Sequence, residues 1–178
     1  VKAKQIDSEE HASLTQTAQC GLLTEVAQQQ GSEGLISHWD SLPRKVKQSQ
    51  HLTHCFVKQL IAGKADSEAY TVVKEALKKN PSPELFTLFP EMNLPDAYPA
   101  TVLLEKTLNK DSSNAEAHSA LAQFYLRDQK WKEAQDHFEK ALELRTSVSD
   151  YSYLSDALEK QNLTKAAHEV SRKALELM

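Results

Sequence analysis

His51, His54 and Cys55 are the residues whose types and spacing come nearest to a metal site in this sequence. Two imidazoles and a thiol can ligate zinc or haem iron. On a helix, residues at i, i+3 and i+4 lie near one face, so the three side chains would share a direction. A fourth ligand and a CxxCH haem-attachment motif are missing. The simpler interpretation is two surface histidines, with Cys55 as a small apolar residue pointing into a helical hairpin beside Phe56. We therefore predict no bound metal.

Catalytic signatures are absent from the sequence. None of the motifs GxSxG, HExxH, GxGxxG and GxxxxGK[ST] occurs. The acidic pairs Glu9/Glu10 and Glu139/Glu143 fit solvated helix surfaces with partners one turn away. Because no set of acid, base and nucleophile can be assembled, we predict that the chain is not an enzyme.

The two cysteines and the apolar runs say little about compartment. Cys20 and Cys55 are isolated, fall in different predicted helices and form no CxxC motif, which argues against a disulfide scaffold. No apolar run approaches the roughly 20 residues that cross a bilayer. The net charge of −4 gives no general case for binding nucleic acid.

Two tryptophans could serve either a core or a binding surface. Trp131 opens a predicted second helix, where a large ring packs across a hairpin. Trp39 lies near Pro43 and Arg44 at a junction between repeats, so it could be a core residue or an interface anchor.

A repeated spacing of alanines indicates which elements position these residues. Three pairs lie seven residues apart in lysine- and glutamate-rich stretches: Ala69 and Ala76, Ala134 and Ala141, Ala167 and Ala174. Small side chains at such positions let stacked helices approach closely. The segment 115–146 fits the tetratricopeptide pattern, with His118, Leu121, Ala122, Tyr125, Ala134, Phe138 and Ala141 in its characteristic places.

The sequence therefore predicts an all-α fold: a right-handed superhelical solenoid of tetratricopeptide repeats with about ten helices. We expect a single domain over residues 1–178. Its parts are leading helices at 1–42, a repeat at 50–81, a degenerate repeat at 82–113, and complete repeats at 115–146 and 148–178.

Several element boundaries follow from local signals. The first helix should bury a stripe of Leu14, Ala18, Leu22 and Val26 and end near 28–31. A later helix should start at Pro43 and end at Gly63. We also expect Leu175 and Leu177 to pack on the preceding hairpin, with part of the terminal face left exposed.

The first helix of each repeat lines a concave groove in tetratricopeptide arrays, which predicts the binding residues. Residues 43–80 hold eight Lys or Arg against three Asp or Glu, a net charge of +5 that leaves −9 for the rest. The groove should run from basic to acidic and bind an extended segment or helix of mixed charge, with Arg145 on the outer side. The predicted partner-binding residues are His51, His54, Lys58, Ile61, Glu116, Ser119, Gln123, Leu126, Ser152 and Asp156.

The chain resembles the C-terminal domain of the HemY family, tetratricopeptide proteins associated with haem biosynthesis. The resemblance rests on Trp39-Asp-Ser-Leu-Pro-Arg44 before the first clear repeat, on the order of complete and degenerate repeats, and on the final Ala-Leu-Glu-Leu. It implies a scaffold for other proteins, among them haem-biosynthetic enzymes. It also implies an N-terminal anchor in the bacterial inner membrane, with this domain on the cytoplasmic side.

Two expectations about the parent protein and its ligand accompany this resemblance. Because the chain begins with Val1 and a helical pattern follows at once, we expect a fragment that lacks the anchor. The alternative function is a porphyrin or haem carrier that uses the groove and the pair His51 and His54.

Overall fold

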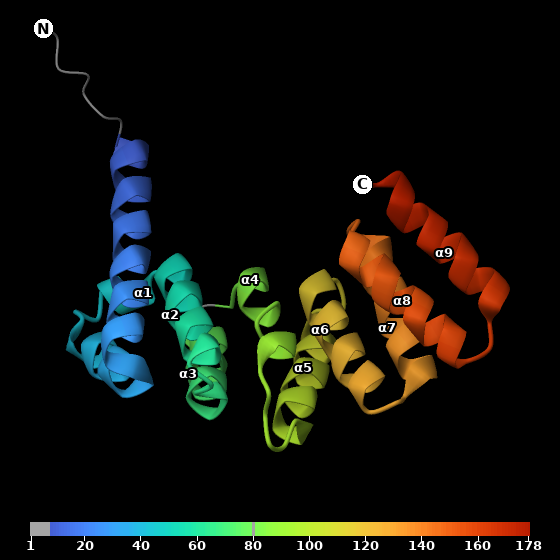
Figure 1. Cartoon of the computed structure of the whole chain (residues 1–178), viewed down its shortest axis with the longest axis horizontal. Coiled ribbons are helices and arrows are strands. Elements are labelled where there is room, and N and C mark those ends of the chain that lie inside the picture. Colours follow the sequence, from blue (N-terminus) through green and yellow to red (C-terminus); the bar gives the residue numbers. More distant parts are fainter. Residues whose placement is uncertain (1–7, 80) are drawn as a thin grey trace, which may run out of the picture. The chain divides into compact units, whose positions relative to one another are not determined.

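The structure is a computed structural model that describes residues 8–79 and 81–178, with side chains from residue 14 onward. Within these residues it contains nine α-helices, two short 3-10 helices and no strand, which confirms the all-α prediction (Figure 1). No helix in this described part has the length and apolarity needed to span a bilayer. The chain divides into two compact units, Val1–Ser82 and Pro83–Met178. The boundary coincides with the predicted end of the first repeat.

The first unit contains α1 and the first complete hairpin. Its elements are α1 (Ser8–Ser41), η1 (Val46–Gln48), α2 (Gln50–Ala62) and α3 (Asp66–Lys79). Gly31, with φ of 68°, kinks α1 where the sequence predicted a break. The helix predicted to start at Pro43 begins instead at Gln50. The reason is local: the Ser49 hydroxyl accepts a hydrogen bond from the Leu52 N–H at 3.3 Å and caps α2.

The apolar stripe predicted for α1 is wrong in its N-terminal part. Leu14 and Leu22 are 60% and 46% exposed, whereas Leu23 and Val26 are buried. The α1 residues that meet α2 lie between Cys20 and Trp39. Figure 1 shows the first turns of α1 extending past α2. Burial on α1 is therefore decided by where its partner helix reaches, which its own periodicity does not encode.

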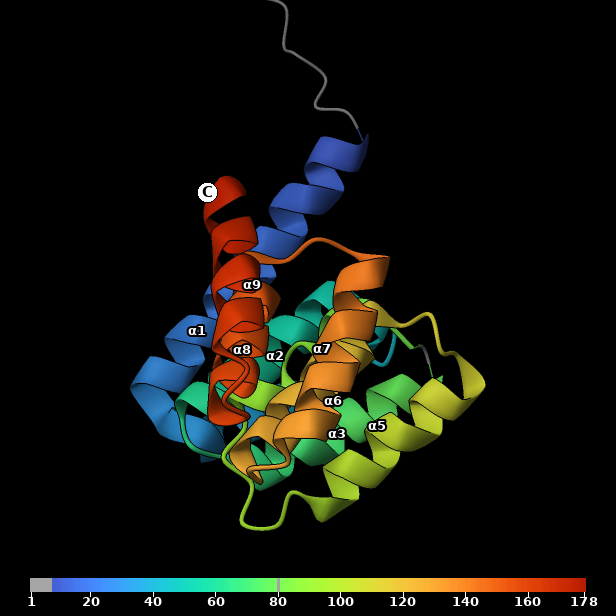
Figure 2. The same cartoon turned by 90° about the vertical axis from the view of Figure 1, so that its right-hand side faces the viewer.

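The second unit contains one degenerate and two complete repeats. The degenerate repeat keeps a one-turn first helix, α4 (Pro83–Phe86), followed by η2 (Phe89–Glu91) and a full second helix, α5 (Tyr98–Lys110). Two hairpins follow: α6 (Ala115–Arg127) with α7 (Trp131–Leu144), and α8 (Val148–Lys160) with α9 (Thr164–Glu176). In order along the chain, α6 packs on α7, α7 on α8 and α8 on α9; Figure 1 shows α8 beside α9, and the two overlap in the view of Figure 2.

The predicted alanines lie at the helix contacts. Ala134, Ala141 and Ala167 are almost completely buried, and Ala69 plays the same part in the first unit. Ala76 is half-buried. In the second unit the core cluster that joins α6 to α9 consists of Ala122, Ala134, Phe138, Leu154, Ala157, Leu158 and Ala167. A methyl group at these positions lets the helix backbones approach while still excluding water.

Each complete hairpin turns with the same backbone geometry. Lys64, Gln129 and Asn162 have φ near +60°, and each follows the last turn of a first helix. The next residue's N–H then donates to a carbonyl five residues back, as from Lys130 to Tyr125 at 2.9 Å. This is a Schellman closure. Gly63 precedes the left-handed residue and has an ordinary φ of −82°, and Asp128 and Gln161 hold the same place in the other two turns, so this turn does not depend on glycine. A Cβ at Gly63 would meet the Ser32 hydroxyl oxygen, which would have to rotate away.

The expectation that Leu175 and Leu177 pack on the preceding hairpin is wrong. Leu175 is 69% exposed and Leu177 is 47% exposed. Ala174 takes the inward position of the last turn, and one residue further along a helix points about 100° away. The apolar terminal residues therefore face outward on α9.

We predict that Ala134→Glu destabilises the chain by at least about 3 kcal/mol, because it forces a long charged side chain into a closed helix contact. Ser152→Glu, the same kind of enlargement at an exposed position of α8, should change the free energy of unfolding by less than about 0.5 kcal/mol. Urea denaturation measures both. Equal midpoints would contradict the assignment of Ala134 to the contact.

Candidate partner-binding site

A cavity of about 510 Å³ lies within the second unit. The first helices of its two complete repeats, α6 and α8, supply most of its wall, and the segments 87–91 and 145–149 supply the rest. The lining residues are Thr87, Pro90, Glu91, Glu116, Ser119, Ala120, Gln123, Arg127, Arg145, Ser147, Ser149, Asp150 and Tyr153. The wall thus mixes apolar surface with hydroxyl groups, one amide and charges of both signs.

Arg145 joins the two helices at the floor of this cavity. Its Nε lies 3.1 Å from Glu116 Oε1 on α6, and its Nη2 lies 3.0 Å from Asp150 Oδ2 on α8. Asp150 is 1% exposed, and its Oδ1 accepts a hydrogen bond of 2.6 Å from the Ser119 hydroxyl. Neither Arg145 Nε nor Asp150 Oδ2 has a partner at hydrogen-bond geometry, so charge attraction dominates this pairing.

The helix starts explain why the two acids lie here. Asn114 caps α6 by accepting from the Ala117 N–H at 2.8 Å, and Ser147 caps α8 by accepting from the Asp150 N–H at 3.2 Å. Glu116 and Asp150 both fall in first turns. A carboxylate there is favoured by the unpaired N–H groups and the positive end of the helix dipole. Arg145, in the linker between α7 and α8, meets both.

Arg127 holds the third wall in place. Its guanidinium donates to the carbonyl of Pro90, and its Nη1 lies 3.5 Å from the carbonyl of Met92. These contacts tie the end of α6 to the segment that carries Glu91. The segment 87–91, which follows α4 and includes η2, is therefore fixed against α6, and it forms one side of the cavity.

His118 of α6 and His137 of α7 form a histidine pair between these two helices. The Nδ1 atoms of His118 and His137 are 2.8 Å apart, and His118 Nε2 lies 3.1 Å from the carbonyl of Ser112. A carbonyl only accepts, so His118 donates through Nε2 and its Nδ1 accepts from His137. Burial lowers the pKa of both rings. At His137 the positive charge that His118 would carry lowers it further, and the pKa falls to about 4. The pair is therefore neutral at pH 7.

Three of the predicted binding residues line the cavity: Glu116, Ser119 and Gln123. Leu126 packs against the apolar core cluster instead. Ser152 and Asp156 are exposed on α8 but lie outside the lining, where Ser149 and Tyr153 take the corresponding places. The register of α8 toward the cavity thus differs from the predicted one.

Arg145 was expected on the outer side, and this placement is wrong, because it lines the cavity between Glu116 and Asp150. Sequence reasoning also missed Asp150, Arg127 and the 87–91 segment. The available signal was the position of Arg145 immediately before a capped helix start. Basic side chains at that position can turn back to first-turn acids.

The remaining predicted residues belong to the first unit. His51 and Lys58 are exposed on α2, and His54 and Ile61 are half-buried there. A groove that continues from these residues to α6 and α8, with a basic-to-acidic gradient, stays a prediction, as do the binding roles of all ten residues. Trp39 stacks on Phe56 with ring centroids 4.1 Å apart, which places it in the core.

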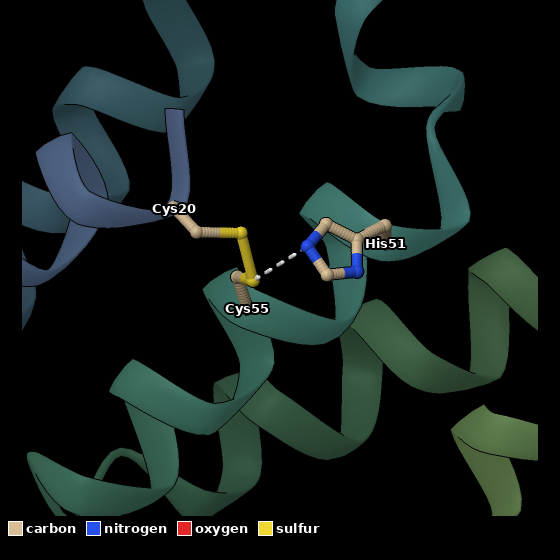
Figure 3. Close-up of side chains that lie close together, drawn as sticks. All are labelled: Cys20, His51 and Cys55. Carbon is tan, nitrogen blue, oxygen red and sulfur yellow. Dashed lines mark hydrogen bonds between the residues drawn. A yellow bond between two sulfur atoms is a disulfide. The ribbon is translucent and has the colours of Figure 1, made fainter. Parts of the chain in front are cut away.

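The reading of the cysteines is corrected by the structure. Cys20 on α1 and Cys55 on α2 form a disulfide with their Cα atoms 5.7 Å apart (Figure 3). Cys55 is therefore no simple apolar partner of Phe56. The pairing joins residues 35 positions apart, and it depends on how α1 packs along α2. The isolated positions of the two cysteines in the sequence could not reveal it.

Comparisons with known proteins agree with this architecture. The family model described as "Tetratricopeptide repeat" matches residues 115–146. The chain is 27% identical over 176 residues, 99% of its length, to Protein HemY of Escherichia coli strain K12, and equally to Protein HemY of Shigella flexneri. It spans 44% of the length of these relatives. The resemblance to the HemY family is thereby confirmed.

Solved structures share the fold. MamA of Desulfovibrio magneticus RS-1, from residue 41 to its end, has a TM-score of 0.58 at 16% identity and covers 91% of this chain and 94% of its own. MamA of MSR-1 has a TM-score of 0.53 at 14% identity, with 92% and 97% covered. At these identities the likeness shows the helical solenoid and nothing about ligands.

We predict that Arg145→Met destabilises the chain by about 2 kcal/mol, because it leaves the buried Asp150 carboxylate without its cation. The loss stays below that of a fully buried pair because Arg145 is 30% exposed. In a double-mutant cycle with Asp150→Asn, the double variant should lose less stability than the sum of the losses in the two single variants. Arg172→Met, which breaks an exposed pair with Glu176 in α9, should cost less than about 0.5 kcal/mol. Strict additivity in chemical denaturation would contradict the buried pairing.

The histidine pair predicts a pH dependence of stability. The folded-state pKa of each ring lies below the unfolded value near 6.5, and that of His137 is about 4. As the pH falls from about 6.5 toward about 4, the unfolded chain therefore takes up the His137 proton while the folded chain does not. The contribution is complete above pH 6.5 and decreases below it. Between pH 7 and 5 the wild type should lose about 1 kcal/mol more than His137→Gln, with partial solvent exposure of the ring taken into account. His168→Gln, at an exposed position of α9, should keep the wild-type slope.

Proposed function

We propose that the chain is a protein-interaction scaffold that binds a segment of another protein in the cavity between α6 and α8. The observation that carries the proposal is that the first helices of two successive tetratricopeptide repeats line one cavity. Repeats of this kind present side chains from their first helices to extended or helical ligands. The cavity has room for several residues of such a segment.

The chemistry of the wall favours an extended segment of mixed charge. Both arginines already contact protein groups: Arg127 binds backbone carbonyls and Arg145 binds carboxylates. A free C-terminal carboxylate therefore finds no uncommitted cation at this wall, although other surfaces of the chain carry many. Hydroxyl groups of Ser147, Ser149 and Tyr153 can exchange hydrogen bonds with a peptide backbone. Glu91 is exposed at the rim and favours a basic side chain on the partner.

The resemblance to HemY supports a more specific role. We propose that the partners are enzymes of haem biosynthesis, and that the parent protein is anchored in the bacterial inner membrane with this domain on the cytoplasmic side. If the domain lies on the cytoplasmic side, the bond between Cys20 and Cys55 is exposed to a compartment that keeps thiols reduced. There the two cysteines would spend most of their time as thiols.

Haem or porphyrin carriage remains a separate prediction. Titration of haemin into the purified chain, with the Soret absorbance compared between the wild type and the His51→Ala/His54→Ala double variant, tests it. Saturable binding lost in the double variant would support the carrier. Unchanged spectra would leave the scaffold as the sole proposal.

The scaffold proposal is tested by partner capture with a matched pair of charge reversals. We expect Glu91→Arg in the parent protein to weaken capture by roughly fivefold, about 1 kcal/mol, because it places a cation against the basic side chain of the partner. Glu143→Arg, an exposed acid of α7 outside the cavity, should leave capture unchanged. The difference should shrink above physiological salt, since exposed charges are already largely screened beyond about 8 Å at physiological ionic strength and this distance shortens as salt rises.

The site of capture can be mapped independently of affinity. A photoreactive residue at Ser149 should crosslink the same partner that co-purifies with the wild type, and one at Glu143 should not. Crosslinking from Glu143 alone would show that the wrong surface has been assigned.

A further inference from the structure

Cys20, Cys55 and His51 form a compact group of metal-ligating side chains in the first unit. Their sulfur and imidazole nitrogen atoms all lie within 4.8 Å of one another. His51 Nε2 is 3.9 Å from the Cys55 sulfur, and both residues project from α2 toward Cys20 on α1 (Figure 3). Cys20, which the sequence analysis did not group with His51 and Cys55, thus joins them from another helix.

We propose that reduction of the Cys20–Cys55 disulfide opens a zinc site made by these two thiolates and His51. Two thiolates and one imidazole are a known ligand set for Zn²⁺, with a water molecule as the fourth ligand. The two thiolates balance the charge of the ion. Their softness also disfavours Mg²⁺ and Ca²⁺, which prefer oxygen ligands.

The disulfide and the metal site exclude each other. Zinc–sulfur bonds of about 2.3 Å at tetrahedral angles hold two sulfurs about 3.8 Å apart, far beyond a covalent sulfur–sulfur bond. Both cysteines are half-buried and His51 is exposed, so the side chains have room to rotate and the group is open to solvent. The Cα separation of 5.7 Å lets both thiolates reach one ion.

The chemistry balances as a thiol–disulfide exchange followed by ion capture. A dithiol reductant transfers two electrons and two protons to the bond, is itself oxidised to a disulfide, and leaves Cys20 and Cys55 as thiols. Binding of Zn²⁺ then releases both thiol protons to solvent. In the oxidised and the zinc-bound state alike, α1 stays joined to α2.

The site differs from the set that the sequence suggested, and this difference makes it testable. His54 lies on α2 one turn beyond His51, but it is not one of the side chains whose ligand atoms lie within 4.8 Å of one another. His54→Ala is therefore a matched control for His51→Ala. Neither variant removes a residue of the cavity in the second unit, so failure of this proposal and failure of the scaffold proposal can be told apart.

The experiment uses the whole 178-residue chain, reduced and freed of reductant without oxygen, and then titrated with Co²⁺ as a probe. We expect one Co²⁺ per chain, with sulfur-to-cobalt charge-transfer absorption that Zn²⁺ abolishes by displacement. The oxidised chain should show none of this absorption. Loss of an outer partner of a metal ligand already weakens binding 10- to 100-fold, so His51→Ala should weaken it at least about tenfold. His54→Ala should bind as the wild type does.

Two results would overturn the proposal. One is a reduced wild-type chain that binds Co²⁺ no better than the oxidised chain does. The other is His51→Ala binding with wild-type affinity while circular dichroism shows a native helix content. Cys20→Ser and Cys55→Ser should each remove the charge-transfer signal. Because the test rests on the reduced wild type and on His51→Ala, a folding defect in either cysteine variant does not decide the outcome.

Discussion

Close approach between neighbouring helices at alanine is the constraint on which the second unit depends. Ala134, Ala141 and Ala167 are buried with almost no exposed surface, and Ala134 and Ala167 share one core cluster with Phe138 of α7 and Leu154 of α8. Larger residues would separate the helices and open the core, whereas glycine would lose helix stability by about 1 kcal/mol. The hairpin turns follow from this packing. A Schellman closure reverses the chain within a few residues, which keeps successive helices near enough for alanine contacts.

The same packing gives α6 its two working faces. Because adjacent residues on a helix point about 100° apart, His118 meets α7 while Ser119 meets α8 and the cavity. A neutral histidine pair on one face and a carboxylate–guanidinium network on the other hold the helix in place from both sides. The cavity is consequently a product of the repeat stacking. Its side chains are positioned by contacts that the hairpins need in any case.

The sequence predicted what local periodicity controls. Alanine spacing located the hairpins, and the predicted end of the first helix near 28–31 falls at the Gly31 kink in α1. It did not predict features that depend on how one helix slides along or rotates against another. The exposed Leu14, the register of α8 and the Cys20–Cys55 bond all have this origin. A shift of one residue along a helix leaves the periodicity nearly intact while it changes every partner. Apart from Glu116, Ser119 and Gln123, the lining of the candidate site therefore emerged only from the packed structure.

Arg145 shows why a residue at a repeat junction can matter more for geometry than for stability. Replacing a buried ion pair by well-packed apolar groups is often neutral, so the net gain from Arg145 and Asp150 is small. Removing one partner is costly, however, because the other charge remains buried. The pair therefore penalises any rotation of α8 against α6 that would separate Asp150 from Arg145 or Ser119. Apolar contacts at the core cluster tolerate such small rotations, since their attraction is non-directional. We infer that the charged network sets the width of the cavity, and that the apolar core supplies the stability that lets the network persist.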